Sequence, residues 1–191
     1  MQRHSFFIAS DTATYQEYFE LRAKEYQRTF GFDGAWLQTE DGYDHSGVIL
    51  VCADTAGRII AGARMNTSTP TQPMRLPMEY GSFSLSLLLP SMNLAQRNYS
   101  EVSRLAVAEE YQNGQLLLEL LDALHEYARS QATPLVFSIC PRVQARRYRI
   151  LRSTGRMNKP FYIFKDIAVP AQFDIEMRLC VFAEEGELEC C

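Results

Sequence analysis

The succession of helix and strand patterns along this chain predicts an α/β protein, with a mixed central sheet flanked by helices. Three observations predict it. Short apolar runs typical of buried strands alternate with amphipathic stretches of helical period. Two of the apolar runs are joined by a turn, as in a hairpin, whereas later ones are separated by helices. The 191 residues, 47% of them hydrophobic, suit one domain with a substantial core, and no repeat or linker divides residues 1–191.

A helix and a loop are expected first. Aromatic residues recur among charges at a helical period over residues 11–30. Asp11 or Thr12 can cap the start of this helix, and Gly31 can end it. Residues 31–46 hold three glycines and several acidic residues without any periodicity. We therefore expect a long, functional loop there.

A hairpin and an irregular insertion follow. Residues 48–53 are apolar and β-branched, 54–57 form a turn, and 58–65 are the return strand. Four prolines interrupt residues 66–98. This stretch is predicted to be irregular, with room for a short helix at 83–89.

The second half alternates strands and helices. The expected strands are 99–107, 135–140, 161–169 and 175–182, and the expected helices are 115–129 and 142–153. Leucines recur on one face of the first of these helices, and the second is rich in arginine. Residues 183–191 form an acidic tail.

Composition and charge exclude several classes of protein. A net charge of −4 argues against a general nucleic-acid binder, and no apolar run reaches the roughly 18 residues that span a bilayer. The N-terminal residues lack the pattern of a signal peptide, so we expect a cytoplasmic location. The five cysteines show no metal-like spacing, which predicts neither a disulfide nor a metal site. Three of them lie in apolar runs and are expected to be buried free thiols.

Three polar clusters adjoin the predicted strands. Asp41 and Asp44 precede the first strand of the hairpin, Arg64 ends the second, and Glu101 and Arg104 lie in the strand after the insertion. A charged side chain next to an apolar strand is costly to bury unless it is paired or functional. In sheets of this kind, ligands gather at strand ends, so these residues are the first candidates for a site.

These clusters belong to a longer pattern that resembles a known family. The pattern comprises Arg22, Tyr26, Trp36, Asp41 with Asp44, Gly62-Ala-Arg64 and Glu101-Val-Ser103-Arg104. In this order and strand context it resembles the acyl-homoserine-lactone synthases, the autoinducer synthases of bacterial quorum sensing. The resemblance covers about residues 10–160. It implies the fold of the GCN5-related N-acetyltransferases, abbreviated GNAT below.

The resemblance also implies a reaction. Members of the family transfer a fatty acyl group from a thioester of acyl carrier protein or coenzyme A to the amino group of S-adenosylmethionine. A lactone then forms, and no tightly bound cofactor is needed. The substrate amine is protonated in water and must lose a proton before it attacks the thioester.

Residue roles follow from the same resemblance. Glu101 is the candidate general base, and Ser103 and Arg104 complete the catalytic set. The substrate-binding set is Arg22, Tyr26, Trp36, Asp41, Asp44 and Arg64. A salt bridge for Glu101 and a turn-forming role for the Asp41/Asp44 pair are the structural alternatives.

The arginine-rich helix predicts how the acyl donor docks. Arg142, Arg146, Arg147, Arg149 and Arg152 occur in a stretch without an acidic residue. Such a surface suits an acidic acyl carrier protein, although a solvated helix face or a nucleic-acid patch would look the same. The segment before residue 115 carries one glycine and nearby acidic residues, which gives weak support for the binding of a coenzyme A diphosphate.

Two further functions stay open. One is an N-acyl amino acid synthase, which uses an ordinary amino acid and forms no lactone. The segment Leu76-Pro-Met-Glu79 and Tyr26, in place of the usual phenylalanine, favour that branch. The other is a non-catalytic protein that binds acyl chains or a protein partner. Acyl-chain length leaves no motif in the sequence.

Overall fold

The computed structural model describes residues 4–31, 38–112, 114–153, 163–172 and 175–183. The helices are α1 (Thr12–Phe30), α2 (Gly42–Ser46), α3 (Leu85–Leu88), α4 (Gln115–Ser130) and α5 (Arg142–Ser153). The strands are β1 (Phe6–Ile8), β2 (Val48–Ala53), β3 (Ile59–Ser68), β4 (Tyr99–Val107), β5 (Leu135–Pro141), β6 (Ile163–Gln172) and β7 (Ile175–Ala183). Short 3-10 helices are η2 (Pro90–Met92), η3 (Leu94–Gln96) and η4 (Glu109–Tyr111).

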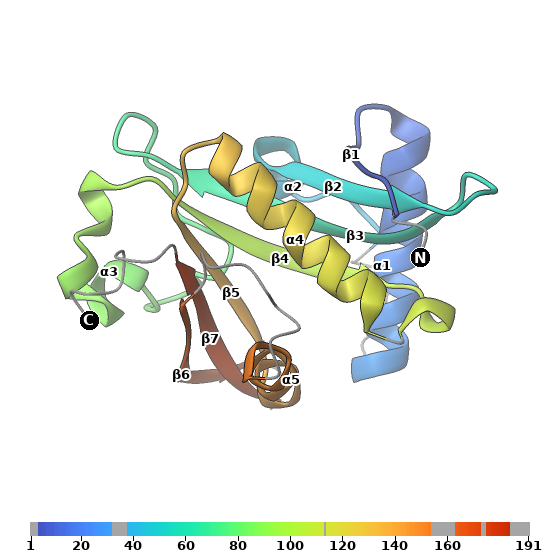
Figure 1. Cartoon of the computed structure of the whole chain (residues 1–191). Coiled ribbons are helices and arrows are strands. Elements are labelled where there is room, and N and C mark those ends of the chain that lie inside the picture. Colours follow the sequence, from blue (N-terminus) through green and yellow to red (C-terminus); the bar gives the residue numbers. More distant parts are fainter. Residues whose placement is uncertain (1–3, 32–37, 113, 154–162, 173–174, 184–191) are drawn as a thin grey trace. The chain divides into compact units, whose positions relative to one another are not determined.

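The strands form one seven-stranded mixed sheet in the order β1-β2-β3-β4-β5-β7-β6. Strands β1, β2 and β3 pair antiparallel, as do β5, β7 and β6. Strand β4 pairs parallel with β5 from Tyr99↔Leu135 to Glu101↔Phe137. The mixed α/β architecture predicted from the sequence is therefore confirmed (Figure 1).

The chain divides into two compact units. The first comprises Met1–Asn66 and Val102–Tyr127, and the second comprises Thr67–Glu101 and Ala128–Cys191. The prediction of a single domain over residues 1–191 stays a prediction.

In the first unit, α1 and α4 cover opposite faces of the β2-β3 hairpin (Figure 1). Asp11 caps the start of helix α1, where its carboxylate accepts a hydrogen bond from Thr14 N, and Gly31 caps the end in the left-handed conformation with φ 70°. Its aromatic residues Tyr18 and Phe19 pack on Ile49 and Val51 of β2. This packing fixes the helix against the strands that carry the polar clusters.

In the second unit, a sheet face packs against the segment between β3 and β4. Phe137, Leu179 and Val181 lie in one buried cluster with Leu76 and Leu85 of that segment. Helix α5 contacts β5, β6 and β7. Tyr148 of α5 stacks edge-on against Phe182, with ring centroids 5.7 Å apart.

Most elements occur where the sequence predicts them, and two differ. Strand β1 is missed by the sequence patterns because its three residues are too few for an alternation to be visible. The loop expected over 31–46 contains the short helix α2, whose capping is described below. Residues 32–37 and 184–191, the latter within the expected acidic tail, lie outside the described residues.

Cys52, Cys140 and Cys180 are buried free thiols, as expected. Within the part of the chain that the structure describes, no helix has the length and apolar character to cross a membrane.

Candidate active site

A network of five charged side chains and one serine, called the charged network below, lies within the first unit and joins four elements. Its members are Arg22 of α1, Asp41 and Asp44 at α2, Arg64 of β3, and Ser103 and Arg104 of β4. The sequence therefore identified residues that the fold brings together, although they are up to 82 positions apart in the chain.

Helix α2 is built by its two aspartates. Asp41 is the N-cap, and its Oδ1 accepts hydrogen bonds from Tyr43 N at 2.8 Å and Asp44 N at 3.0 Å. Asp44 Oδ2 in turn accepts from Asp41 N at 3.0 Å, which completes a capping box. The spacing of the pair thus has a structural cause, in agreement with the turn-forming alternative.

Asp44 is enclosed by two guanidinium groups. Arg22 Nη1 donates to both of its carboxylate oxygens at 3.1 Å, and Arg64 Nη1 donates to Oδ1 at 3.0 Å. Only 3% of Asp44 is exposed, and Arg22 and Arg64 are 1% exposed. Because breaking a buried ion pair leaves a charge without compensation, these three side chains hold one another in place.

Asp41 stands at the accessible edge of the network. Its Oδ1 is 2.6 Å from Arg64 Nη1, its Oδ2 is 3.5 Å from Arg104 Nη2, and 35% of its side chain is exposed. Burial alone would raise the pKa of Asp41, but the hydrogen bond and charge of Arg64 lower this pKa below its ordinary value. Asp41 and Arg104 therefore present a carboxylate and a guanidinium side by side, partly open to solvent.

The backbone of β4 is distorted at Arg104, whose φ of 56° lies in the left-handed region. In a regular strand, neighbouring side chains point to opposite faces. Here Ser103 Oγ accepts from Arg64 Nε at 3.2 Å while Arg104 pairs with Asp41, so both reach the same network. The left-handed residue re-aims the side chain, as β-bulges do.

Tyr18 holds this distorted backbone. Its hydroxyl donates to the carbonyl oxygen of Arg104 at 2.6 Å, and burial raises the pKa of Tyr18 above its ordinary value, so the group stays a donor. The ring fits because Gly62 has no side chain: a Cβ there would lie 2.7 Å from Tyr18 Cδ2. Tyr18 is not among the site residues predicted from the sequence, although it stands one turn before Arg22 on α1.

Glu101 belongs to the second unit and is 3% exposed. Its Oε2 accepts a hydrogen bond from Met78 N at 2.8 Å. The neighbouring Glu79 accepts from Leu76 N and Leu85 N, each at 3.0 Å. The segment 76–79 that the sequence analysis singled out is therefore fixed by its own carboxylate and attached to Glu101.

The remaining predicted residues lie elsewhere or outside the described part. The ring of Tyr26 stacks edge-on against Phe30 at 5.4 Å, and Trp36 lies outside the described residues. On α5, Arg142, Arg146 and Arg149 are exposed and Arg147 is half-buried, whereas the side chain of Arg152 is not described. Among the described residues, no group of three His, Cys, Asp or Glu side chains has the geometry to hold a metal ion.

The fold and the family together define an acyltransferase of the GNAT type. The chain belongs to the family of the N-acyl amino acid synthase FeeM, whose family model matches residues 17–159. No curated protein matches the chain in sequence.

Solved structures share the fold at low sequence identity. The CoA-dependent acyl-homoserine lactone synthase BjaI is 18% identical, with a TM-score of 0.68 over 97% of this chain and 86% of that one. FeeM from uncultured soil microbes is 11% identical, with a TM-score of 0.65 over 96% and 92%. An HPA2-related acetyltransferase from Corynebacterium glutamicum is 13% identical, with a TM-score of 0.60 over 96% and 97%.

Proposed function

We propose that this protein joins a fatty acyl group, delivered as a thioester by acyl carrier protein, to the α-amino group of an amino acid. The family match over residues 17–159 carries this proposal, because its members are N-acyl amino acid synthases. The sequence favoured S-adenosylmethionine as the amine substrate, whereas the family match favours an ordinary amino acid.

Glu101 is the proposed general base. It takes a proton from the ammonium group, directly or through a water, and the free amine then attacks the thioester carbonyl carbon. The attacking nitrogen of the resulting tetrahedral intermediate loses its second proton, the C–S bond breaks, an amide forms, and the leaving thiolate takes up a proton. The hydrogen bond from Met78 N to Glu101 Oε2 supports this role, because it fixes the orientation of the carboxylate.

Asp41 and Arg104 are proposed to bind the amino acid. A zwitterion needs a cation for its carboxylate and an anion for its ammonium group, and these two side chains offer both at a separation of 3.5 Å. Arg22, Asp44 and Arg64 are proposed to position them, since all three are buried and bonded to one another. Tyr26, Trp36 and Ser103 remain candidates for further substrate contacts.

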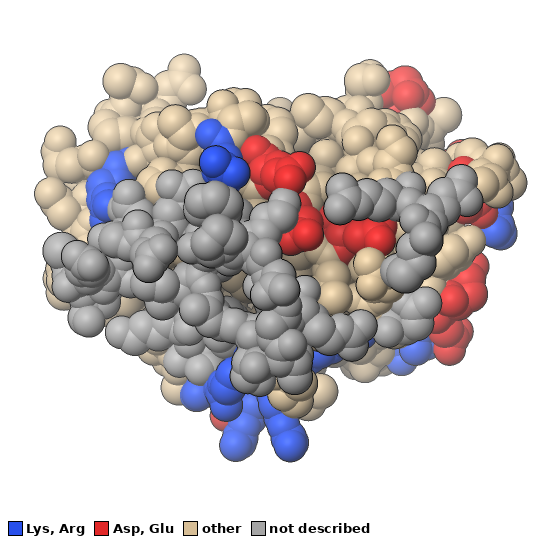
Figure 2. All heavy atoms as spheres, in the orientation of Figure 1, with Lys and Arg blue, Asp and Glu red and all other residues tan. Residues whose placement is uncertain are grey.

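Acyl carrier protein is the proposed donor. Helix α5 exposes Arg142, Arg146 and Arg149 beside Val143 and Ile150, which are 82% and 50% exposed. Basic side chains gather at the edge of the molecule where α5 lies (Figures 1 and 2). Apolar anchors within a positive rim suit an acidic protein partner.

The loop before α4 gives a second reason to favour the carrier protein. A helix N-terminus normally favours the binding of an anion. Here, however, the exposed residues Glu109 and Glu110 lie in η4, directly before the N-terminus of α4. Their charges would repel the diphosphate of coenzyme A. Acyl carrier protein contributes one phosphodiester at this place in its thioester arm.

S-adenosylmethionine is the second candidate amine. Apart from Glu101, every described acidic and basic residue of the pattern that resembles the lactone synthases belongs to the charged network. The lactone synthase BjaI, solved with SAM and isopentyl-CoA, also shares the fold. With this amine, the carboxylate could displace methylthioadenosine and close a lactone. An ordinary amino acid has no such leaving group.

A reconstitution experiment distinguishes these functions. Purified protein is incubated with acyl carrier proteins of several chain lengths and with a mixture of the common amino acids and S-adenosylmethionine, and products are identified by mass spectrometry. An N-acyl amino acid is expected. A homoserine lactone would establish the second candidate, and no acylated product from any donor would leave the non-catalytic alternative.

The base is tested by Glu101→Gln, for which we expect a loss of kcat of at least about 100-fold. Glu109→Gln is the matched control because Glu109 is an exposed carboxylate of the same size. Wild-type activity of Glu101→Gln would remove this residue from the proposed mechanism.

A further inference from the structure

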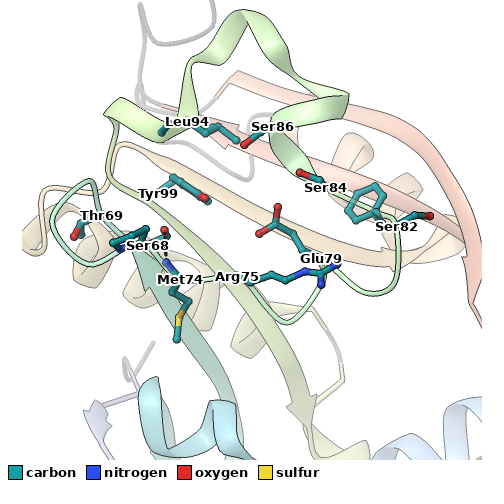
Figure 3. Close-up of a pocket in the computed structure, with 13 residues that line it drawn as sticks. Ser68, Thr69, Met74, Arg75, Glu79, Ser82, Ser84, Ser86, Leu94 and Tyr99 are labelled. Atoms are coloured by element: carbon teal, nitrogen blue, oxygen red, sulfur yellow. Dashed lines mark hydrogen bonds between the residues drawn. The ribbon is translucent and has the colours of Figure 1, made fainter.

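Two hollows of similar size adjoin one short segment of the second unit. The first, of about 500 Å³, is called the polar hollow and is lined by Ser68, Thr69, Arg75, Glu79, Tyr99 and three serines of the 82–86 segment (Figure 3). The second, of about 540 Å³, is called the apolar hollow. Residues 82–84 line both hollows and form a shared wall.

The linings of the two hollows differ in chemistry. Apart from residues 80–84, the apolar hollow is lined by Leu87, Leu88, Ile139, Ala168 and Val169. Ile139, Val169 and Phe83 also pack against the buried core cluster of the second unit. The polar hollow also has apolar lining residues, among them Met74 and Leu94, but it adds hydroxyl groups, a guanidinium and a carboxylate, against which a hydrocarbon chain gains little.

Several of the exposed large apolar side chains of the protein lie at the apolar hollow. Seven such side chains are exposed among the described residues, and three of them, Tyr80, Leu87 and Leu88, line this hollow. Their exposed fractions are 80%, 79% and 36%. Clustered exposed apolar groups beside a concave surface are typical of a binding site whose ligand is apolar.

We propose that the apolar hollow binds the distal part of the fatty acyl chain and that Phe83 limits the chain length it accepts. This inference rests on the proposed function, which requires a place for a hydrocarbon chain. Phe83 stands in the wall that separates the two hollows. A chain that fills the apolar hollow would therefore have to displace this ring before it could extend further.

Binding of unreactive fatty acids tests the hollow separately from catalysis. Decanoate, dodecanoate and tetradecanoate are titrated into the protein and followed by calorimetry. Each methylene that leaves water is expected to tighten binding up to about fourfold. Ala168→Phe, which fills the apolar hollow from β6, is expected to abolish this increase with length.

Ser86→Phe is the matched control. It places the same side chain at an exposed position that lines the polar hollow and not the apolar one. We expect it to leave the length dependence unchanged. Phe83→Ala, which joins the two hollows, should move the length of strongest binding to longer acids, and Phe83→Leu serves the same test if Phe83→Ala fails to fold. An unmoved length of strongest binding overturns the limit assigned to Phe83.

The outcomes separate this inference from the proposed function. Length dependence that survives Ala168→Phe, or that Ser86→Phe removes instead, overturns the inference even if acylated amino acids are formed. No length-dependent binding to the wild type also overturns it. Binding that depends on Ala168 without any acylated product would retain the hollow as an acyl site and reject the proposed function.

Discussion

At the scale of single residues, Tyr18 and Arg104 decide the shape of the candidate site. The Tyr18 hydroxyl donates a hydrogen bond of 2.6 Å to the carbonyl oxygen of Arg104, a left-handed residue within strand β4. A left-handed non-glycine residue costs about 1–3 kcal/mol and persists only where its surroundings fix it. The strand therefore depends on α1 for the orientation of Arg104.

Replacement of Tyr18 by Phe tests this dependence. We expect a loss of about 1 kcal/mol in the free energy of unfolding, because one buried hydrogen bond is removed. Arg104 should lose its alignment with Asp41, so kcat/KM should fall about 10- to 100-fold, mostly through KM for the amine. Urea unfolding and steady-state kinetics measure the two effects.

Tyr15→Phe is the control for that variant. Tyr15 also lies on α1, and its hydroxyl donates to the carbonyl of Ala9 at 3.0 Å, away from the charged network. It should lower stability to a similar extent without changing kinetics. Equal kinetic losses in both variants would contradict a specific role for Tyr18.

The lowered pKa of Asp41 predicts a pH effect on stability. In the unfolded protein, an aspartate takes up its proton near pH 3.9. In the folded protein, Asp41 is still ionised at that pH because its pKa is lowered. The unfolded state therefore binds more protons as the pH falls through this range, and stability decreases. Asp41→Asn should reduce the steepness of this decrease below about pH 4 in urea unfolding, and an unchanged slope would contradict the ion pair with Arg64.

At the scale of elements, the packing of α1 on β3 depends on Gly62. A Cβ at this position would lie 2.7 and 2.9 Å from two ring carbons of Tyr18, which is closer than a Cβ atom approaches a non-bonded carbon in folded proteins. The glycine in the Gly62-Ala-Arg64 pattern is thus explained by the helix that crosses it. Arg64, two residues further along the strand, also depends on this packing for its place beside Arg22.

Gly62→Ala is therefore expected to destabilise the protein by about 1–3 kcal/mol through overpacking. Gly42→Ala is the control, because a Cβ at Gly42 would meet nothing within 4 Å. Thermal unfolding compares the two variants. Equal stability of both would show that α1 shifts freely, which would also remove the basis for the role of Tyr18.

At the scale of the whole molecule, a basic helix is set in an acidic protein. The net charge is −4, yet α5 carries five arginines and no acidic residue. Attraction between this helix and an acidic carrier protein would be local and would weaken as salt screens it.

Reversal of charge on α5 tests this surface. The double variant Arg146→Glu/Arg149→Glu should raise KM for acyl carrier protein substrates roughly tenfold or more at low salt. Small acyl thioesters should react as before, because they lack the carrier protein. Arg129→Glu reverses an exposed charge on α4 and should change neither value; the same increase in KM there would indicate a general charge effect.

The sequence by itself determined most of the secondary structure and the members of the charged network. Periodicity, caps and prolines placed α1, the β2-β3 hairpin, α4 and α5, because these signals act between neighbours in the chain. The order of charged residues identified the members of the network and the enzyme class. Strand β1 was too short for any such signal.

Only the tertiary structure decided what each charged residue does. Asp41 and Asp44 are the same residue type three positions apart, yet Asp44 is enclosed by Arg22 and Arg64 while a third of Asp41 is exposed. Likewise, Tyr18 acquires its role through a carbonyl 86 positions away. Burial and ion pairing depend on groups that are distant in the chain, so no local pattern could assign them.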